Sequence, residues 1–565
     1  MPNANLDESS WQVRAADAYA ETQAKIPAAW RIDERLLAPA WIDATEDFEK
    51  VEKRVDHVLE QSGILSQAEL DLVHTDVTTL VAKLQSGQLT AVETVTAFCK
   101  SAAIAQQLYR CCTELFFDRA LARARKLDED RLETGKTSGP LHGLPVSLKD
   151  QYELKGVRTT IGLTSMLDHV GKHDAAVVQA LESEGAVIFV KSNVPMSLMS
   201  ADSVNNVWGR CQNPNDRTRT AGGSSGGEAV LSAAFASPVG IGSDIAGSCR
   251  IPSAMCGTYG FKPSFGRIPM LGGVGCGTGA EFVLPVLGPM ARSVAGLELL
   301  MQSIAATEPW NVDPTCVPMP WTPVHFDRPL RIGIMYDNGM VAPHPPISRM
   351  LKETAAKLQD AGHEVIEWNV GDMHDRAHML AHAFFRQDGG ATLSSALKGE
   401  PILPNVDTGC PGSELNADEM RGKHWEAFGL RVEYRQRWNA LKLDAVICPI
   451  TSHAAVRHNE FNDVTYSLPW NLLQYCAAAM PVGQVEERDL ALDASYASEP
   501  ARVYLEGKKG LKPSRGEAEN RAIWLDEEER RSMVGLPLSL QVVTPNYTDE
   551  RCLAVVRLID ELVNV

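Results

Sequence analysis

Two segments of the chain show the same alternation of helix and strand signals, which constrains the fold more than any other feature. In "HDAAVVQALESEGAVIFVKSNVP", a helical pattern ends at Gly185 and a buried strand follows over residues 186–190. In "LRIGIMYDNG" and "ISRMLKETAAKLQDAGHEVIEW", a strand, a helix, Gly362 and another strand follow in order. Alternating units of this kind predict an α/β protein with a large mixed, mostly parallel β-sheet sandwiched between helices.

The rest of the chain fits this plan around one main domain. Residues 1–75 are polar, rich in Asp and Glu, and interrupted by prolines, so we expect an N-terminal helical arm on a main domain of residues 76–565. Thr90 and Glu93 form a capping-box signal ahead of an amphipathic helix. "LDAVICPI" and "LPLSLQVVTP" predict later strands, and the charged residues 484–530 predict a surface excursion.

Composition and charge exclude several classes of partner. The net charge is −18 and no long basic tract occurs, so neither nucleic acid nor an anionic lipid surface is an expected partner. The first thirty residues lack the pattern of a secretory signal, and no run of 18 apolar residues occurs, so we expect a cytoplasmic protein without a membrane span. The 12 scattered cysteines indicate reduced thiols rather than disulfides or a zinc ribbon.

A glycine-rich serine cluster, "AGGSSGGEAV", is the first candidate site. Its G-x-S-x-G pattern would make Ser224 the nucleophile of an α/β-hydrolase, with His453 or His458 as base, but the preceding "QNPNDRTRTA" is loop-like where that fold requires a strand. A phosphate-binding turn is a second interpretation, although no P-loop lysine follows. A plain glycine turn before a helix is the default for the segment taken alone.

Two further segments carry chemistry. Lys149 ends the apolar run of "GLPVSLKD", where burial would lower its pKa and supply a neutral amine as base; an ion pair with Asp150 is the alternative. Ser248 follows "DIAG", whose successive N–H groups are donors of the kind that an acyl-transfer oxyanion requires. Asp244 and Arg250 flank this serine and either brace its turn or form a surface ion pair of little value.

Taken together, these segments resemble the amidase signature family, and the resemblance covers most of the chain from about residue 75. "GLPVSLKD", "KSNVP", "NPNDRTRTAGGSSGGE", "GSDIAGSCRIPSAMCGTYGFKPS", "DAVICPIT" and "GLPLSLQVV" follow in the family's order. "SVNNVWGR", "APHPPI" and "ITSHAAVRH" are similar to the fungal acetamidase-like branch. The resemblance implies hydrolysis of a small carboxamide by a Ser-cisSer-Lys triad without metal or organic cofactor.

The family's residue roles carry over to matching positions of this chain. The resemblance implies that Ser248 is the nucleophile, Lys149 the base, and Ser224, after a cis peptide bond, the bridge between them. It implies oxyanion donors and substrate contacts at the following positions: the backbones of Ile245, Ala246, Gly247 and Ser248, with Ser224 and Leu198. Asp244, Arg250 and Ser225 are expected to support the site. Residues of about 300–530 are expected to shape the substrate pocket.

One residue departs from the family's pattern. The family commonly has Gly-Gly before the nucleophile, whereas this chain has Ala246-Gly247. The methyl group of Ala246 is expected to narrow the acyl pocket or to resist a positive φ, so we expect altered substrate preference with retained activity.

Other candidates and other functions stay open at this stage. His374, His378 and His382 have i, i+4, i+8 spacing, from which one metal ion reaches two neighbours but not all three; a structural role is favoured. A nucleophilic Cys276 lacks an obvious histidine partner. Acyl transfer or ester hydrolysis through the same acyl-serine is the enzymatic alternative, and an amidotransferase-like assembly subunit the non-enzymatic one. The resemblance leaves a homodimer open.

Overall fold

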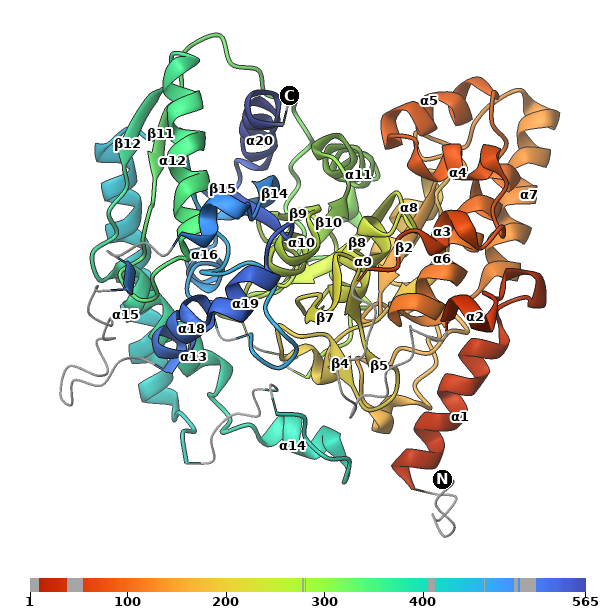
Figure 1. Ribbon diagram of the computed structural model, residues 1–565, viewed down its shortest axis with the longest axis horizontal. Coiled ribbons are helices and arrows are strands. Elements are labelled where there is room, and N and C mark those ends of the chain that lie inside the picture. The colour runs from red at the N-terminus through yellow and green to blue at the C-terminus, as the bar shows by residue number, and fades with distance from the viewer. Residues whose placement is uncertain are drawn as a thin grey trace.

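The computed structural model describes residues 10–37, 54–276, 279, 281–404, 406, 412–461, 463–491, 496–497 and 515–564. One sheet runs through this part of the chain (Figure 1). Its strands are β1 Cys112–Leu115, β2 Pro145–Lys149, β3 Val187–Ser192, β8 Val239–Asp244, β9 Tyr259–Lys262, β10 Val286–Ala291, β11 Arg331–Ile334, β12 Glu364–Glu367, β13 Ala445–Pro449, β14 Cys476–Gln484 and β15 Pro537–Thr544. Their order is β1-β3-β2-β8-β10-β9-β14-β15-β13-β11-β12.

The expected fold class, a large mixed sheet flanked by helices, is confirmed. β2 pairs in parallel with β3 and β8, and β11 pairs in parallel with β12 and β13. The remaining neighbours are antiparallel, a larger share than alternating units predict. Two strands account for most of these pairs, because β10 lies antiparallel between β8 and β9 and β15 lies antiparallel between β13 and β14.

Helices surround this sheet, and the expected helix limits agree closely with the observed ones. The helices are α1 Trp11–Ala24, α2 Glu34–Leu37, α3 Val58–Gln61, α4 Gln67–His74, α5 Val77–Ser86, α6 Ala91–Tyr109, α7 Phe117–Thr134, α8 Ala176–Ser183, α9 Gly226–Ala233, α10 Arg250–Cys256, α11 Val294–Ala306, α12 Pro345–Asp360, α13 Met373–Phe385, α14 Ala391–Leu397, α15 Ala417–Ala440, α16 Leu468–Leu472, α18 Arg515–Leu525, α19 Glu527–Ser532 and α20 Asp549–Val563. The predicted capping box of Thr90 and Glu93 begins α6. Gly185, with φ of +91°, separates α8 from β3.

The N-terminal helices lie at one end of the molecule, and the elements after about residue 330 lie at the other (Figure 1). Helix α1 is held against β1: Thr22 Oγ1 donates to Thr113 O over 3.0 Å, and Lys25 Nζ lies 2.5 Å from Glu114 Oε2. The division of the chain at residue 75 stays a prediction.

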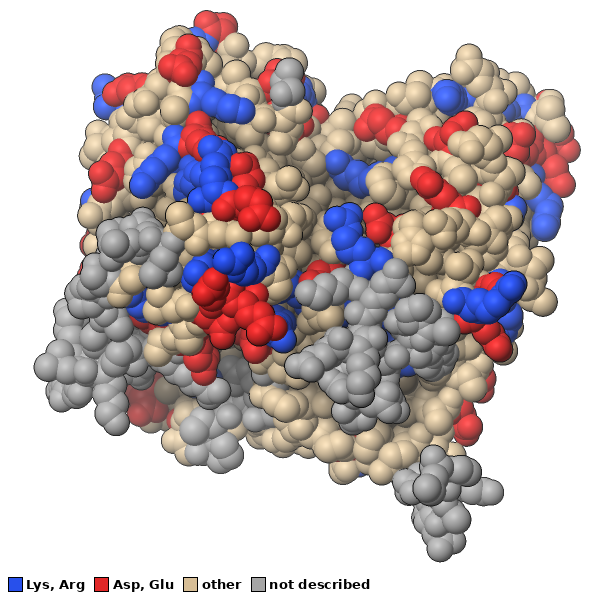
Figure 2. Space-filling view, viewed as in Figure 1, with Lys and Arg blue, Asp and Glu red and all other residues tan. Residues whose placement is uncertain are grey.

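The interpretation of residues 484–530 as a surface excursion is wrong for α18. Asn520 and Trp524 of this helix are fully buried, and Asn520 Nδ2 donates to Ala342 O over 2.8 Å. Glu517 and Arg521 of the same helix are buried as well, so α18 packs on the body of the protein largely through polar side chains that the sequence shows only as charges. Positive and negative side chains intermingle on the face shown in Figure 2, without a large patch of one sign. None of the described helices has the length and apolar character needed to cross a bilayer.

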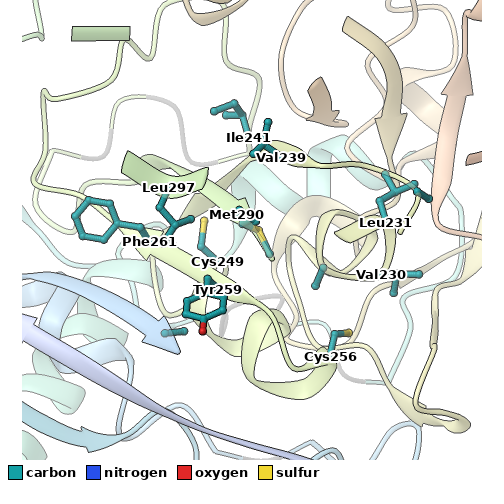
Figure 3. Close-up of a cluster of buried hydrophobic side chains, with 14 of the residues drawn as sticks. Val230, Leu231, Val239, Ile241, Cys249, Cys256, Tyr259, Phe261, Met290 and Leu297 are labelled. Carbon is teal, nitrogen blue, oxygen red and sulfur yellow. The ribbon is translucent and has the colours of Figure 1, made fainter. Parts of the chain in front are cut away.

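Register places the two predicted chemical segments side by side on neighbouring interior strands of the sheet. Leu148 of β2 is opposite Ile241 of β8, and the two strands are parallel, so their carboxyl ends lie at the same edge. Apolar side chains from α9, α10, β8, β9 and β10 belong to one continuous cluster (Figure 3). Cys249, directly after Ser248, is fully buried in this cluster and anchors the turn.

Candidate active site

Lys149 is the last residue of β2, and its amine lies among hydroxyl groups. The side chain is fully buried, and Nζ is hydrogen-bonded to Ser224 Oγ at 2.7 Å and to Ser243 Oγ at 2.9 Å. The alternative ion pair with Asp150 is not formed, because the carboxylate of Asp150 pairs with Lys191 at 2.8 Å. Lys149 is therefore free of a direct carboxylate partner and contacts two serines from separate turns.

Burial lowers the pKa of Lys149 from its ordinary 10.5 to about 8, and the neighbouring ionisable groups of Cys249, Asp244 and Glu228 act in the opposite direction. At this pKa an appreciable fraction of the amine is neutral near neutral pH. Lys262 is also buried with a pKa of about 8, but its Nζ donates to the carbonyl of Tyr475 at 2.6 Å. The hydroxyl partners distinguish Lys149 from Lys262, and the absence of a carboxylate partner in the described structure distinguishes it from the third buried lysine, Lys191.

The Ser224 turn lies between β7 (Asp216–Thr220) and α9. The segment before it, expected to be a loop, forms a hairpin of β6 (Gln212–Asn213) and β7, which stands apart from the large sheet. The Gly223-Ser224 peptide bond is cis, in agreement with the family resemblance. A Cβ at Gly223 would lie 2.7 Å from Ser200 O, so only glycine fits there.

Ser225 joins the two serine turns to each other. Its N–H donates to Ser248 O over 3.1 Å. Its hydroxyl exchanges hydrogen bonds with the backbone of Ser243, donating to O and accepting from N, each over 3.2 Å. Ser225 is fully buried, so these bonds are shielded from water and fix the distance between Ser224 and the end of β8.

Asp244 and Arg250 form a buried, two-pronged ion pair rather than a surface pair. Arg250 Nη2 lies 2.9 Å from Asp244 Oδ1 and Nε lies 3.0 Å from Oδ2, with both side chains fully buried. Asn471 Nδ2 donates to the same Oδ1 over 2.9 Å. Burial opposes ionisation of Asp244, but Arg250 and Asn471 hold its pKa below the usual range. The pair closes the turn that carries Ser248.

The turn also arranges the expected oxyanion donors. The N–H of Gly247 donates to Asp244 Oδ1 over 2.9 Å. The N–H groups of Ile245, Ala246 and Ser248 form no hydrogen bond with any other described residue. Three of the four expected donors are therefore available to a ligand, and the fourth braces the turn.

Ser248 differs from its partners in exposure and contacts. It is 8% exposed, whereas Ser224 is 2% exposed and Lys149 is fully buried. No hydrogen bond joins the hydroxyls of Ser224 and Ser248, although both residues belong to the described part of the chain. Ser248 is thus the most accessible of the three residues, at the outer end of the group.

Ala246 does not take up the strained backbone considered above. It is not among the described residues with positive φ; Gly247 has the positive φ, +124°. A Cβ at Gly247 would lie 2.6 Å from Ser467 Oγ, and the same hydroxyl donates to Ala246 O over 2.6 Å. The methyl group of Ala246 therefore costs no backbone strain and affects the site only through the space that it fills.

Leu198, the expected substrate contact, belongs to a short 3₁₀ turn, η4 (Met196–Leu198), and has φ of +68°. Its side chain packs against an apolar cluster that includes Ile161, Leu163 and Met196. Ser200, two residues after Leu198, lies close to the backbone of Gly223. No printed contact joins Leu198 to Ser224 or Ser248, so its role stays a prediction.

Four polar residues at the site were missed by the sequence analysis. Ser243 contacts Lys149, and its hydroxyl donates to Gln151 Oε1 over 2.6 Å. Glu228 of α9 accepts a hydrogen bond from Ser147 Oγ over 2.6 Å. Burial raises the pKa of Glu228 to about 7, against the hydrogen bonds and the charge of Lys149. The alternation of side chains along a strand could have found Ser147, because Ser147 and Lys149 are two residues apart in β2 and lie on the same face.

The histidine series of α13 divides into two environments. His374 is buried against Tyr434, with Nε2 3.1 Å from the phenol oxygen, and burial lowers its pKa to about 3. His378 and His382 contact each other through Nε2 atoms 3.2 Å apart. In the described ranges, no group of three His, Cys, Asp or Glu side chains is arranged to hold a metal ion.

The alternative nucleophile assignments find no partners at the site. His453 Nδ1 contacts Ala454 O at 2.8 Å, and His458 Nε2 contacts Arg217 O at 2.9 Å. Neither forms a hydrogen bond with Ser224 in the described structure. Burial raises the pKa of Cys276 to about 11, which disfavours its thiolate. The α/β-hydrolase and thiol interpretations therefore lack a base.

Comparison with known proteins identifies the class as amide hydrolases. The sequence model of the Amidase family matches residues 93–553, and the chain belongs to this family, the amidase signature family. It is similar to the acetamidase of Emericella nidulans, with 36% identity over 98% of each chain. The acetamidase of Aspergillus oryzae is 32% identical over 99% of each chain.

Among solved structures, the fold matches that of a fatty acid amide hydrolase with a TM-score of 0.87. The two chains are 30% identical, and the match covers 99% of this chain and 96% of the other. The sequence resemblance to the family is therefore confirmed over nearly the whole chain.

Proposed function

We propose that the protein hydrolyses a small carboxamide to the carboxylate and ammonia through an acyl-serine intermediate at Ser248. The observation that carries the proposal is the buried amine of Lys149, 2.7 Å from Ser224 Oγ. A neutral, desolvated amine beside a hydroxyl is a general base for a serine nucleophile. Family membership and the similarity to two fungal acetamidases support the choice of a small amide.

The first half of the reaction forms the acyl-enzyme. Neutral Lys149 takes the proton of Ser224 Oγ while Ser224 takes that of Ser248, and the Ser248 oxygen adds to the amide carbonyl. This transfer requires the accessible hydroxyl of Ser248 to turn toward Ser224 when substrate binds. The free N–H groups of Ile245, Ala246 and Ser248 stabilise the oxyanion, and Gly247 holds the turn through Asp244.

The second half releases both products. Ser224 donates a proton to the leaving nitrogen and is reprotonated by Lys149, the carbon–nitrogen bond breaks, and ammonia departs. Water then loses a proton to the same relay and attacks the acyl-serine ester, and Ser248 recovers its proton as the carboxylate leaves. Asp244, Arg250 and Ser225 act by holding the two turns in place.

Ammonia release from acetamide and a series of longer amides tests the proposal. Ser248→Ala and Lys149→Met should each lower turnover by about 10³-fold or more. Ser253→Ala is a matched control, because Ser253 is buried five residues further along α10 and its hydroxyl has no hydrogen-bond partner. Full turnover in the first two variants would refute the assignment.

Two measurements separate this function from its alternatives. Hydroxylamine added to the reaction captures the acyl group as a hydroxamate if the acyl-serine transfers to other nucleophiles. A serine-directed phosphonate should label the wild type and not Ser248→Ala. Absence of labelling in the wild type would favour the non-enzymatic alternative, an assembly subunit.

A further inference from the structure

The amine of Lys149 has a second hydroxyl partner that the proposed reaction does not use. Ser243, the penultimate residue of β8, lies 2.9 Å from Nζ and is 6% exposed. Its hydroxyl donates to Gln151 Oε1 over 2.6 Å, and Gln151 follows Lys149 by two residues, just past the end of β2. The four groups form a chain: Ser224, Lys149, Ser243, Gln151.

Counting protons fixes the direction of these hydrogen bonds. A serine hydroxyl has one proton, and an amide oxygen only accepts. Because Ser243 gives its proton to Gln151, its oxygen can only accept from Lys149. A neutral amine has two N–H bonds and one lone pair, so the lone pair cannot be used toward Ser243. It is left for the proton of Ser224.

We propose that Ser243 is a positioning residue for the base: it holds an N–H of Lys149, while Gln151 keeps the Ser243 proton away from the amine's lone pair. The inference rests on the proposed function, in which Lys149 accepts the Ser224 proton. Ser243 acts through Lys149 and does not touch the substrate.

The arrangement also acts on the charged form of the base. When Lys149 becomes an ammonium during the attack, Ser243 accepts a charge-assisted hydrogen bond from it. Removing this acceptor makes the ammonium less stable, so Lys149 becomes a weaker base with a lower pKa. The charged or ionisable groups that bear on Lys149 are Cys249, Asp244 and Glu228, and none of them changes in the variants below.

The test is the pH profile of kcat/KM for amide hydrolysis in Ser243 variants. Ser243→Ala should lower the high-pH plateau about tenfold or more and move the midpoint of the rising limb to lower pH. Ser243→Thr keeps the hydroxyl and should restore both values toward wild type. Ser237→Ala is the matched control: it removes a buried hydroxyl just before β8 that contacts only the carbonyl of Val239.

Variants of Gln151 give shifts of a different kind. Gln151→Glu keeps the acceptor and adds a negative charge near Lys149, so the midpoint should move to higher pH. Gln151→Met removes the acceptor and frees the Ser243 proton to occupy the lone pair, so the plateau should fall several-fold. Thermal unfolding shows whether each variant folds. If Ser243→Ala does not fold, the two Gln151 variants test the positioning role of Ser243.

The outcomes separate this inference from the proposed function. If Ser243→Ala leaves the midpoint unmoved and loses no more activity than Ser237→Ala, the positioning role is overturned. The same holds if Gln151→Glu shifts the midpoint downward. If Lys149→Met and Ser248→Ala, measured alongside, keep their activity, the proposed function itself fails.

Discussion

Replacing Lys149 by methionine tests the central physical claim, that the fold holds a desolvated amine at a cost in stability. Burial lowers the pKa of Lys149 from 10.5 to about 8. The proposed reaction uses the neutral form, so wild-type kcat/KM should rise about tenfold between pH 7 and pH 9, as the neutral fraction grows from about a tenth to about nine tenths. Lys149→Met should abolish the activity and the pH-dependent limb.

The same pKa predicts the effect on folding. A lysine whose folded pKa is lowered destabilises the protein at pH values below the folded pKa, and the penalty disappears as pH rises from about 8 toward 10.5. The penalty at pH 7 is about 3 kcal/mol, since one pKa unit corresponds to about 1.4 kcal/mol. Lys149→Met removes it and loses two hydrogen bonds of about 1 kcal/mol each.

The free energy of unfolding of Lys149→Met at pH 7 should therefore exceed that of wild type by about 1 kcal/mol; this advantage should vanish near pH 9 and become a deficit of about 1 kcal/mol near pH 10. Urea unfolding of both proteins from pH 6 to pH 10 measures this difference, with Lys83→Met, at a partly exposed position of α5, as control. If Lys149→Met is inactive and also several kcal/mol less stable than wild type at pH 7, the reasoning is refuted, because Lys149 would then stabilise the fold rather than destabilise it.

Other predictions concern neighbouring groups. Arg250→Met leaves Asp244 buried without its ion-pair partner and should destabilise the fold by about 3–5 kcal/mol in urea unfolding; a loss below 1 kcal/mol would contradict this. Ala246→Gly should shift the preferred acyl-chain length in an amide series, and an unchanged ranking would reject a role for the methyl group. Gly429→Ala, in α15 with no atom within 4 Å of the new Cβ, should raise the unfolding free energy by about 1 kcal/mol, with no change in kcat/KM.

Local sequence signals predicted much of the fold and the identity of the three principal site residues. The helix stop at Gly185 and the capping box at Thr90 depend on neighbours within a few residues, and both are confirmed. The lysine and the two serines were found through ordered motifs, and the structure brings Lys149 and Ser224 into contact. Their catalytic roles stay proposals.

Long-range contacts account for what the sequence analysis missed. Asp150 follows Lys149 directly in the sequence, which suggests an ion pair between them. In the structure Asp150 forms its ion pair with Lys191 of the adjacent strand β3. The charges of α18 predict a surface excursion from the sequence, whereas the burial of Trp524 depends on the distant residues that pack over it. The hydrogen bond from Ser243 to Gln151 joins residues 92 positions apart.

The sequence by itself determined which side chains are present, where helices and strands begin, and which family the chain resembles, because these follow from local chemistry and ordered motifs. Only the tertiary structure decided what surrounds the amine of Lys149. Its pKa depends on desolvation, and the direction of its hydrogen bonds depends on Ser243, both set by neighbouring strands whose register no local pattern specifies.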